Sequence, residues 1–146
     1  AIDDKGVIWV STRNQELYRL NNAQYDGKQT LITKYIDKHG LPDGEIVPLN
    51  VDGDIVFTSI DGLFRYSGND DNPLERIEGF PSFLTEKGNR VSRWYADPFQ
   101  TKGQARIWFE TDSSVGYLRK QQNGTWTVND LFFKQVSSKL TKVILY

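Results

Sequence analysis

The side chains in this sequence that could carry out chemistry are mainly carboxylates. Asp43 with Glu45, and Glu110 with Asp112, form pairs two residues apart, and paired carboxylates could supply the acid and the base of glycoside hydrolysis. Pairs at this spacing are also common at the edges of strands, and the sequence shows no apolar pocket around them of the kind that surrounds a catalytic carboxyl group. We therefore predict that the chain is not an enzyme and contributes no catalytic residue.

Other reactive groups are few. His39 is the only histidine and cysteine is absent, so the sequence cannot assemble a multi-histidine or thiolate metal site. Acidic residues cluster at 3–4, 52–54 and 70–72, but none of these clusters has the alternating ligands and the later glutamate of a calcium loop. We interpret them as solvated turns, and we expect the chain to bind no metal and no cofactor.

Charge and composition exclude two further classes of partner. The 18 basic and 19 acidic residues are interspersed and leave a formal net charge of −1, which gives no basic patch for nucleic acid. The longest apolar runs, such as residues 55–57 and 143–146, are far shorter than the roughly 20 residues of a membrane helix. We expect no nucleic-acid partner and no membrane contact within this segment.

The sequence contains a repeat of predicted strands. Aromatic residues form 13% of the chain, and its Val, Ile, Phe, Tyr and Trp residues suit strands. Three passages of alternating apolar residues, at 6–12, 53–59 and 104–111, each end on a small hydroxyl residue. Aligned on their isoleucines, successive passages lie 47 and 52 residues apart, and such periods are typical of repeat architectures.

Each passage belongs to a unit of four predicted strands. A short polar turn, a second aromatic strand and a third strand follow it, and a fourth strand precedes the next passage. In the middle unit the predicted order from the innermost strand outward is 46–49, 55–59, 63–66 and 74–77. The pattern predicts an all-β fold, a partial β-propeller of about three four-stranded antiparallel blades of a larger propeller, rather than a sandwich or a barrel.

The whole chain, residues 1–146, is predicted to be a single fragment of such a propeller. It divides into a blade part at 4–37, blades at 46–78 and 89–129, and the inner strand of a next blade at 141–146. Because a propeller needs about four to eight blades to close, we expect the native chain to extend beyond both ends. The expected partners are further blades of the same parent chain or a homo-oligomer, and Trp9 and Trp108, at equivalent positions, are expected to pack between blades.

Several of these residues resemble a known pattern. Residues 6–12 read Gly-Val-Ile-Trp-Val-Ser-Thr and are followed at 17–20 by Leu-Tyr-Arg-Leu. The link at 40–42 reads Gly-Leu-Pro, and residues 61–66 read Asp-Gly-Leu-Phe-Arg-Tyr. Across residues 4–66 this arrangement resembles the regulator-propeller repeat of bacterial two-component sensors, which are histidine kinases or hybrid two-component proteins.

The resemblance implies a ligand-sensing propeller in signal transduction. Such a propeller would be periplasmic, as the extracytoplasmic part of an inner-membrane protein, and its ligand would be an oligosaccharide. The catalytic output, a histidine kinase or a diguanylate cyclase, would lie outside this chain. Two other functions stay open, a propeller scaffold for protein partners and a glycan-active propeller enzyme.

The predicted strand order also selects candidate binding residues. Loops that enter the innermost strands and loops between the second and third strands would share one rim, where propellers usually bind their partners. The polar residues of these loops are the predicted contacts: Arg13, Asn14, Asp43, Glu45, Asp61, Arg90 and Asp112.

Overall fold

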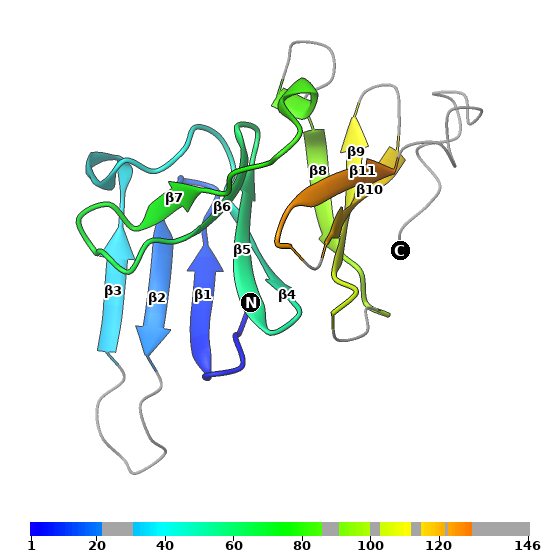
Figure 1. The fold of residues 1–146 in the computed structure, drawn as a ribbon. Helices are drawn as coiled ribbons and strands as arrows, with labels where there is room; N and C mark the ends of the chain where they lie inside the picture. Colours follow the sequence, from blue (N-terminus) through cyan, green and yellow to red (C-terminus); the bar gives the residue numbers. More distant parts are fainter. Residues whose placement is uncertain (22–30, 86–90, 100–102, 112–114, 122, 130–146) are drawn as a thin grey trace. The chain divides into compact units, whose positions relative to one another are not determined.

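A computed structural model describes residues 1–21, 31–85, 91–99, 103–111, 115–121 and 123–129 of the chain. The described residues form three antiparallel sheets and two short 3-10 helices (Figure 1). None of the helices among them is long and apolar enough to cross a membrane. The predicted all-β fold is therefore confirmed at the level of separate antiparallel sheets.

The first sheet has three strands in the order β1-β2-β3. Its strands are β1 (Val7–Ser11), β2 (Leu17–Asn21) and β3 (Leu31–Tyr35), and the 3-10 helix η1 (Asp37–His39) follows. Strand β1 begins after a turn in which the Gly6 N–H donates to the Asp3 carbonyl over 3.0 Å. Gly6 has a φ of 78°, a left-handed conformation that glycine adopts without strain.

The second sheet has the order β4-β5-β6-β7. Its strands are β4 (Val47–Val51), β5 (Asp54–Ser59), β6 (Gly62–Tyr66) and β7 (Leu74–Arg76). The third sheet, after the 3-10 helix η2 (Ser82–Thr85), consists of β8 (Val91–Ala96), β9 (Arg106–Thr111), β10 (Val115–Lys120) and β11 (Trp126–Asn129), again in chain order. The predicted strands fall on these elements with small differences at their ends, and the strand predicted at 141–146 lies outside the described residues.

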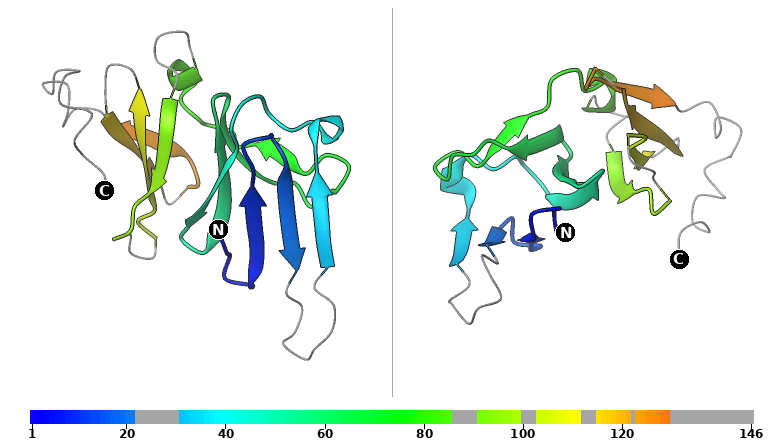
Figure 2. Two further views of the ribbon diagram at one scale, coloured as in Figure 1. Left: turned by 180° about the vertical axis from the view of Figure 1, so that it is seen from behind. Right: turned by 60° about the horizontal axis from the view of Figure 1, so that its bottom comes forward.

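The chain divides into two compact units, Ala1–Ile77 and Glu78–Tyr146. In the first unit the two sheets lie face to face, as both views of Figure 2 show. Their core contains Trp9, Leu17 and Tyr35 from one sheet, and Phe57 and Leu74 from the other. Alternation along each strand explains this arrangement, because successive side chains point to opposite faces of a sheet.

Trp9 lies at the centre of this core. It is 3% exposed, and its ring centroid is 4.8 Å from that of Phe57 in an edge-to-face contact and 5.2 Å from that of Tyr66. Such aromatic pairs stabilise a core beyond the area that they bury. Trp9 therefore packs between two sheets, whereas Trp108 is half-buried and contacts Tyr117 of its own sheet at 5.1 Å.

In the second unit one face of β9 and β10 is fully buried. Ile107 is 0%, Phe109 1% and Leu118 0% exposed. Gly116 pairs directly with Phe109, and a Cβ atom on it would lie 2.7 Å from the Phe109 ring. A glycine is therefore needed at position 116 because the Phe109 ring covers the strand there.

Candidate functional site

Two of the predicted rim residues lie in the turn between β1 and β2. Arg13 and Asn14 are exposed there. The turn is closed by the Thr12 N–H, which donates to the Glu16 carbonyl over 2.9 Å, and by Gln15, which has a φ of 59°. This backbone conformation presents both side chains to solvent at the end of the first sheet.

Two others are brought together at the second sheet. The Asp43 N–H, in the loop that enters β4, donates to Asp61 Oδ2 over 3.2 Å in the turn between β5 and β6. The Asp61 N–H donates in turn to Ser59 Oγ over 3.0 Å. Glu45 is exposed in the same loop as Asp43. At this sheet, the loop before the first strand and the turn between the second and third strands are therefore in contact.

The last two predicted residues, Arg90 and Asp112, lie outside the described residues. The pair of Glu110 with Asp112 consequently has no description, whereas Asp43 and Glu45 are both exposed carboxylates. Within the described part of the chain, no group of three or more His, Cys, Asp and Glu residues could hold a metal ion. The described rim side chains can exchange hydrogen bonds with a polar ligand, but they lack the buried setting of a catalytic acid and base.

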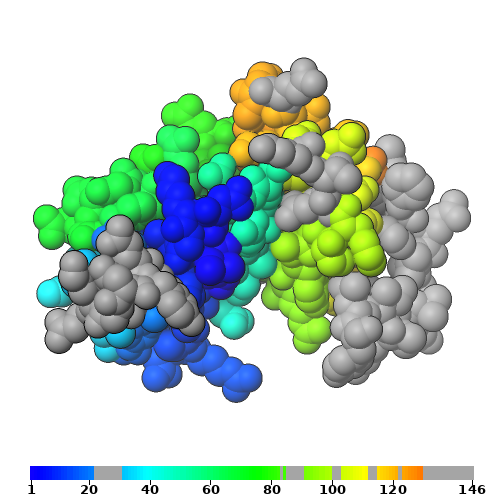
Figure 3. Space-filling model, turned by 90° about the horizontal axis from the view of Figure 1, so that it is seen from below, coloured from blue at the N-terminus to red at the C-terminus, as the bar shows by residue number. Residues whose placement is uncertain are grey.

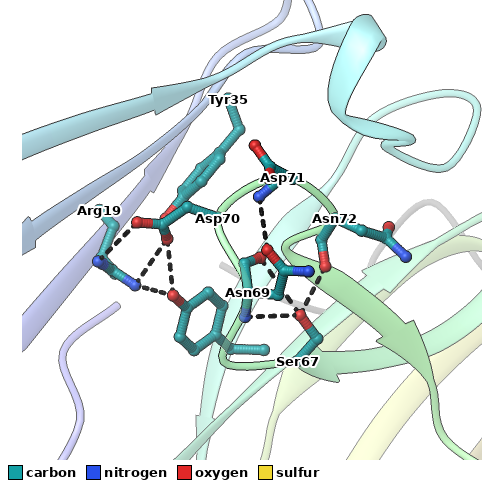
Figure 4. A network of polar contacts seen from close by, with 8 residues as sticks. Arg19, Tyr35, Ser67, Asn69, Asp70, Asp71 and Asn72 are labelled. Atoms are coloured by element: carbon teal, nitrogen blue, oxygen red, sulfur yellow. Dashed lines mark hydrogen bonds and ion pairs between the residues drawn. The ribbon is translucent and has the colours of Figure 1, made fainter.

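A further polar cluster was not predicted from the sequence, and Figure 4 shows it. Asp70, in the loop between β6 and β7, accepts hydrogen bonds from the Tyr35 hydroxyl at 2.6 Å and the Tyr66 hydroxyl at 2.7 Å. It also pairs with Arg19, whose Nη1 lies 3.1 Å from Asp70 Oδ1. Arg19 donates to the Tyr66 hydroxyl, and its guanidinium carbon lies 4.8 Å from the centre of the Tyr66 ring. We call these four residues the Asp70 cluster.

The loop around Asp70 is fixed by its own hydrogen bonds. Ser67 Oγ accepts from the Asn69 N–H over 3.0 Å and donates to the Asn72 carbonyl over 2.5 Å (Figure 4). Asn69 Oδ1 accepts from the Asp71 N–H over 2.9 Å. Short polar side chains close turns of this kind by bonding to the nearby backbone. They hold Asp70 in position to reach the first sheet.

The electrostatics of the Asp70 cluster favour a static role. Hydrogen bonds from Tyr35 and Tyr66 lower the pKa of the Asp70 carboxyl, and the positive charge of Arg19 acts in the same direction. Burial, and then the hydrogen bond to Asp70, raise the pKa of both Tyr35 and Tyr66. Near neutral pH the carboxylate is ionised and both phenols are protonated, so no member is ready for proton transfer. The cluster links the first and second sheets.

The second unit contains an ion pair between a buried carboxylate and a partly exposed arginine, and the sequence did not predict it. Asp97 is 4% exposed, its Oδ2 lies 2.7 Å from Arg106 Nη2, and its Oδ1 accepts from the Phe99 N–H over 2.9 Å. The Arg106 guanidinium carbon lies 5.8 Å from the centre of the Tyr117 ring. These contacts fix the start of the loop after β8, where the Phe99 side chain is 84% exposed.

Comparisons with protein-family models, curated proteins and solved structures find no match to this chain. The sheets, the rim residues and the sequence pattern are therefore the basis of the proposed function.

Proposed function

We propose that the chain is part of the ligand-sensing β-propeller of a bacterial two-component regulator, and that it has no catalytic activity of its own. Its sheets would be successive blades, and the propeller would lie in the periplasm as the extracytoplasmic part of an inner-membrane protein. The kinase or cyclase output would be encoded elsewhere in the parent protein.

One observation carries this proposal, the repetition of the same antiparallel hairpin in successive sheets. Val10 pairs with Tyr18 in the first sheet, and the aligned residues Phe57 and Phe109 pair with Phe64 and Gly116 in the second and third. The first two sheets also pack face to face through Trp9 and Phe57. A propeller is built from repeated four-stranded antiparallel sheets arranged radially, so this repetition supports the proposal. The sensor role is supported by the resemblance of residues 4–66 to the regulator-propeller repeat.

The proposed binding surface is the rim that contains Arg13, Asn14, Asp43, Glu45 and Asp61. These side chains offer both donors and acceptors, which an oligosaccharide with many hydroxyl groups would need. The contact between Asp43 and Asp61 gives this surface a defined shape at the second sheet.

Binding of oligosaccharides tests this surface. We expect at least one oligosaccharide in a library to bind the chain by isothermal titration calorimetry, and Arg13→Ala and Asp61→Ala each to weaken it by about 10-fold, because each removes a charged hydrogen-bonding group. Lys38→Ala, at an exposed position in η1, is the matched control and should leave the affinity unchanged. If both rim variants bound as tightly as the unaltered chain, these residues would not form the binding surface.

A second function, a scaffold for protein partners, is favoured by one observation. Phe99 is 84% exposed on a loop whose start is held by Asp97, and aromatic side chains are enriched in protein interfaces. This alternative would be preferred if the parent protein had no membrane-spanning helix.

A further inference from the structure

One face of the first sheet carries an uncovered row of apolar side chains. Direct strand pairing places Ile2, Ile8, Leu20 and Ile32 side by side on this face, because Ile2 pairs with Ile8, Ile8 with Leu20 and Leu20 with Ile32. Val10, two residues after Ile8, lies on the same face. Ile2 is 52%, Val10 45% and Ile32 59% exposed. We call these five residues the open face.

The equivalent positions in the second sheet are covered. The repeat of 47 residues aligns Ile8 with Ile55 and Val10 with Phe57. The register agrees, since Val10 pairs with Tyr18 and Phe57 pairs with Phe64. Phe57 is 0% exposed and belongs to the same core as Trp9 of the first sheet. Ile55 packs against this core. In the second sheet this face is therefore the surface on which the preceding sheet packs.

The equivalent positions in the third sheet are buried as well. The alignment places Ile107 and Phe109 at the positions of Ile8 and Val10, and these side chains are 0% and 1% exposed. Of the three described sheets, the first alone leaves this face exposed. A face built from side chains that are buried in both other sheets is of the type that another sheet covers.

The edge of β1 that pairs with residues 1–3 indicates where the chain would connect to that covering sheet. Ala1 and Trp9 exchange backbone hydrogen bonds, each of 2.8 Å, and the Asp3 N–H donates to the Val7 carbonyl over 3.0 Å. In the second sheet the equivalent edge of β5 is paired along the five residues Val47–Val51. Residues 1–3 thus occupy the positions of the last residues of a fourth strand, and Figure 3 shows this dark-blue segment at the surface.

We infer that, in the parent protein, polypeptide preceding Ala1 completes this fourth strand and then covers the open face with another antiparallel sheet of the same repeat. This inference rests on the proposed function and goes beyond it by naming the docking surface and the edge through which the preceding sheet connects. A large apolar side chain of the covering sheet would contact Val10. This contact would correspond to that of Trp9 with Phe57, whose ring centroids are 4.8 Å apart. The ladder that Ala1 and Trp9 begin would continue to Ser11, because alternate residues of β1 face this edge.

The test compares one substitution in two proteins. In the 146-residue chain, Ile32→Lys is expected to shift the melting temperature by no more than about 2 °C, because position 32 is exposed there. In the parent protein with at least one upstream repeat, the same substitution is expected to lower it by about 5 °C or more, because it buries an unpaired charge. Lys38→Glu, on η1, is the matched control and should have little effect in either protein.

Hydrogen exchange gives a second readout, which needs no substituted protein. The Ser11 amide is expected to exchange at least about 10-fold more slowly in the parent protein than in the 146-residue chain, since the completed strand would accept its N–H. Equal effects of Ile32→Lys and equal Ser11 exchange in the two proteins would overturn the inference, as would a parent protein without an upstream repeat. The proposed sensor function would survive these results, because it fails instead if the parent protein has no membrane helix and no kinase or cyclase.

Discussion

Replacing Trp9 with alanine is expected to lower the free energy of unfolding of the first unit by about 3–5 kcal/mol. Trp9 is 3% exposed and contacts rings from both sheets, Phe57 at 4.8 Å and Tyr35 at 6.0 Å between centroids. Its removal would leave a cavity at the centre of the interface between these sheets, and the surrounding side chains would fill that cavity only in part. A free-energy loss of this size is a large part of the stability of a small domain.

Urea-induced unfolding, with hydrogen exchange of the amides in β1 to β7 as a local readout, measures this effect. Val10→Ala is the matched control, since Val10 is the next residue on the same strand but is 45% exposed on the opposite face. We expect the control to change the free energy of unfolding by about 0.5 kcal/mol or less. Equal effects of the two substitutions would show that the first two sheets do not pack through Trp9.

The second expected effect concerns Asp70, whose replacement by asparagine should destabilise the first unit by about 1–2 kcal/mol at neutral pH. The substitution removes the charge that faces Arg19 and weakens the acceptor for the Tyr35 and Tyr66 hydroxyls. Solvent limits the loss, because the Asp70 side chain is 52% exposed.

The same substitution should alter the acid dependence of stability. Hydrogen bonds from the two tyrosines lower the pKa of Asp70 from its ordinary value of 3.8, so the folded state favours the ionised carboxyl. An aspartate of this kind adds stability that is fully present above its unfolded pKa and is lost as the pH falls through its lowered folded pKa. Below about pH 4 we therefore expect the difference in unfolding free energy between the unaltered chain and Asp70→Asn to shrink.

Denaturant titrations at a series of pH values would measure this difference. Asp71→Asn is the matched control, because Asp71 is exposed in the same loop and is joined to it through its backbone N–H. A difference that stayed constant from neutral pH to pH values well below the ordinary pKa would contradict the role given to the Asp70 carboxylate.

The strands could be predicted from the sequence because their signal is local. Alternating apolar residues such as Ile8, Val10 and Phe57 mark each strand, and glycine or asparagine turns separate them. Strand order within each sheet followed from the same signal, because short turns join antiparallel neighbours. The stacking of the first two sheets through Trp9 was also predictable, from its place in the repeat.

The Asp70 cluster could not be predicted, because its partners are far apart in sequence. Arg19 and Asp70 are separated by 51 residues, and nothing near either residue indicates the other. The interpretation of residues 70–72 as a solvated turn describes Asp71 and Asn72 but misses the contacts of Asp70 with the first sheet. Asp97 and Arg106 are closer in sequence, but the repeat is defined by its apolar residues and does not indicate that these two charges pair.

The positions of the rim residues could be predicted from the sequence, but their function could not. Loop positions followed from strand order, and Asp43 and Asp61 do meet at the second sheet. Whether these side chains bind a ligand depends on chemistry that strand order does not determine. Binding by the rim therefore stays a prediction, while the Asp70 cluster has a geometry that assigns it to joining sheets.

The coding sequence of the parent gene on both sides of this segment tests the central proposal most directly. We expect further repeats of about fifty residues, enough for at least a four-bladed propeller, followed by one membrane-spanning helix and a histidine kinase or diguanylate cyclase. A gene that encoded neither further repeats nor a membrane helix would contradict the proposal that this chain is part of a sensor propeller.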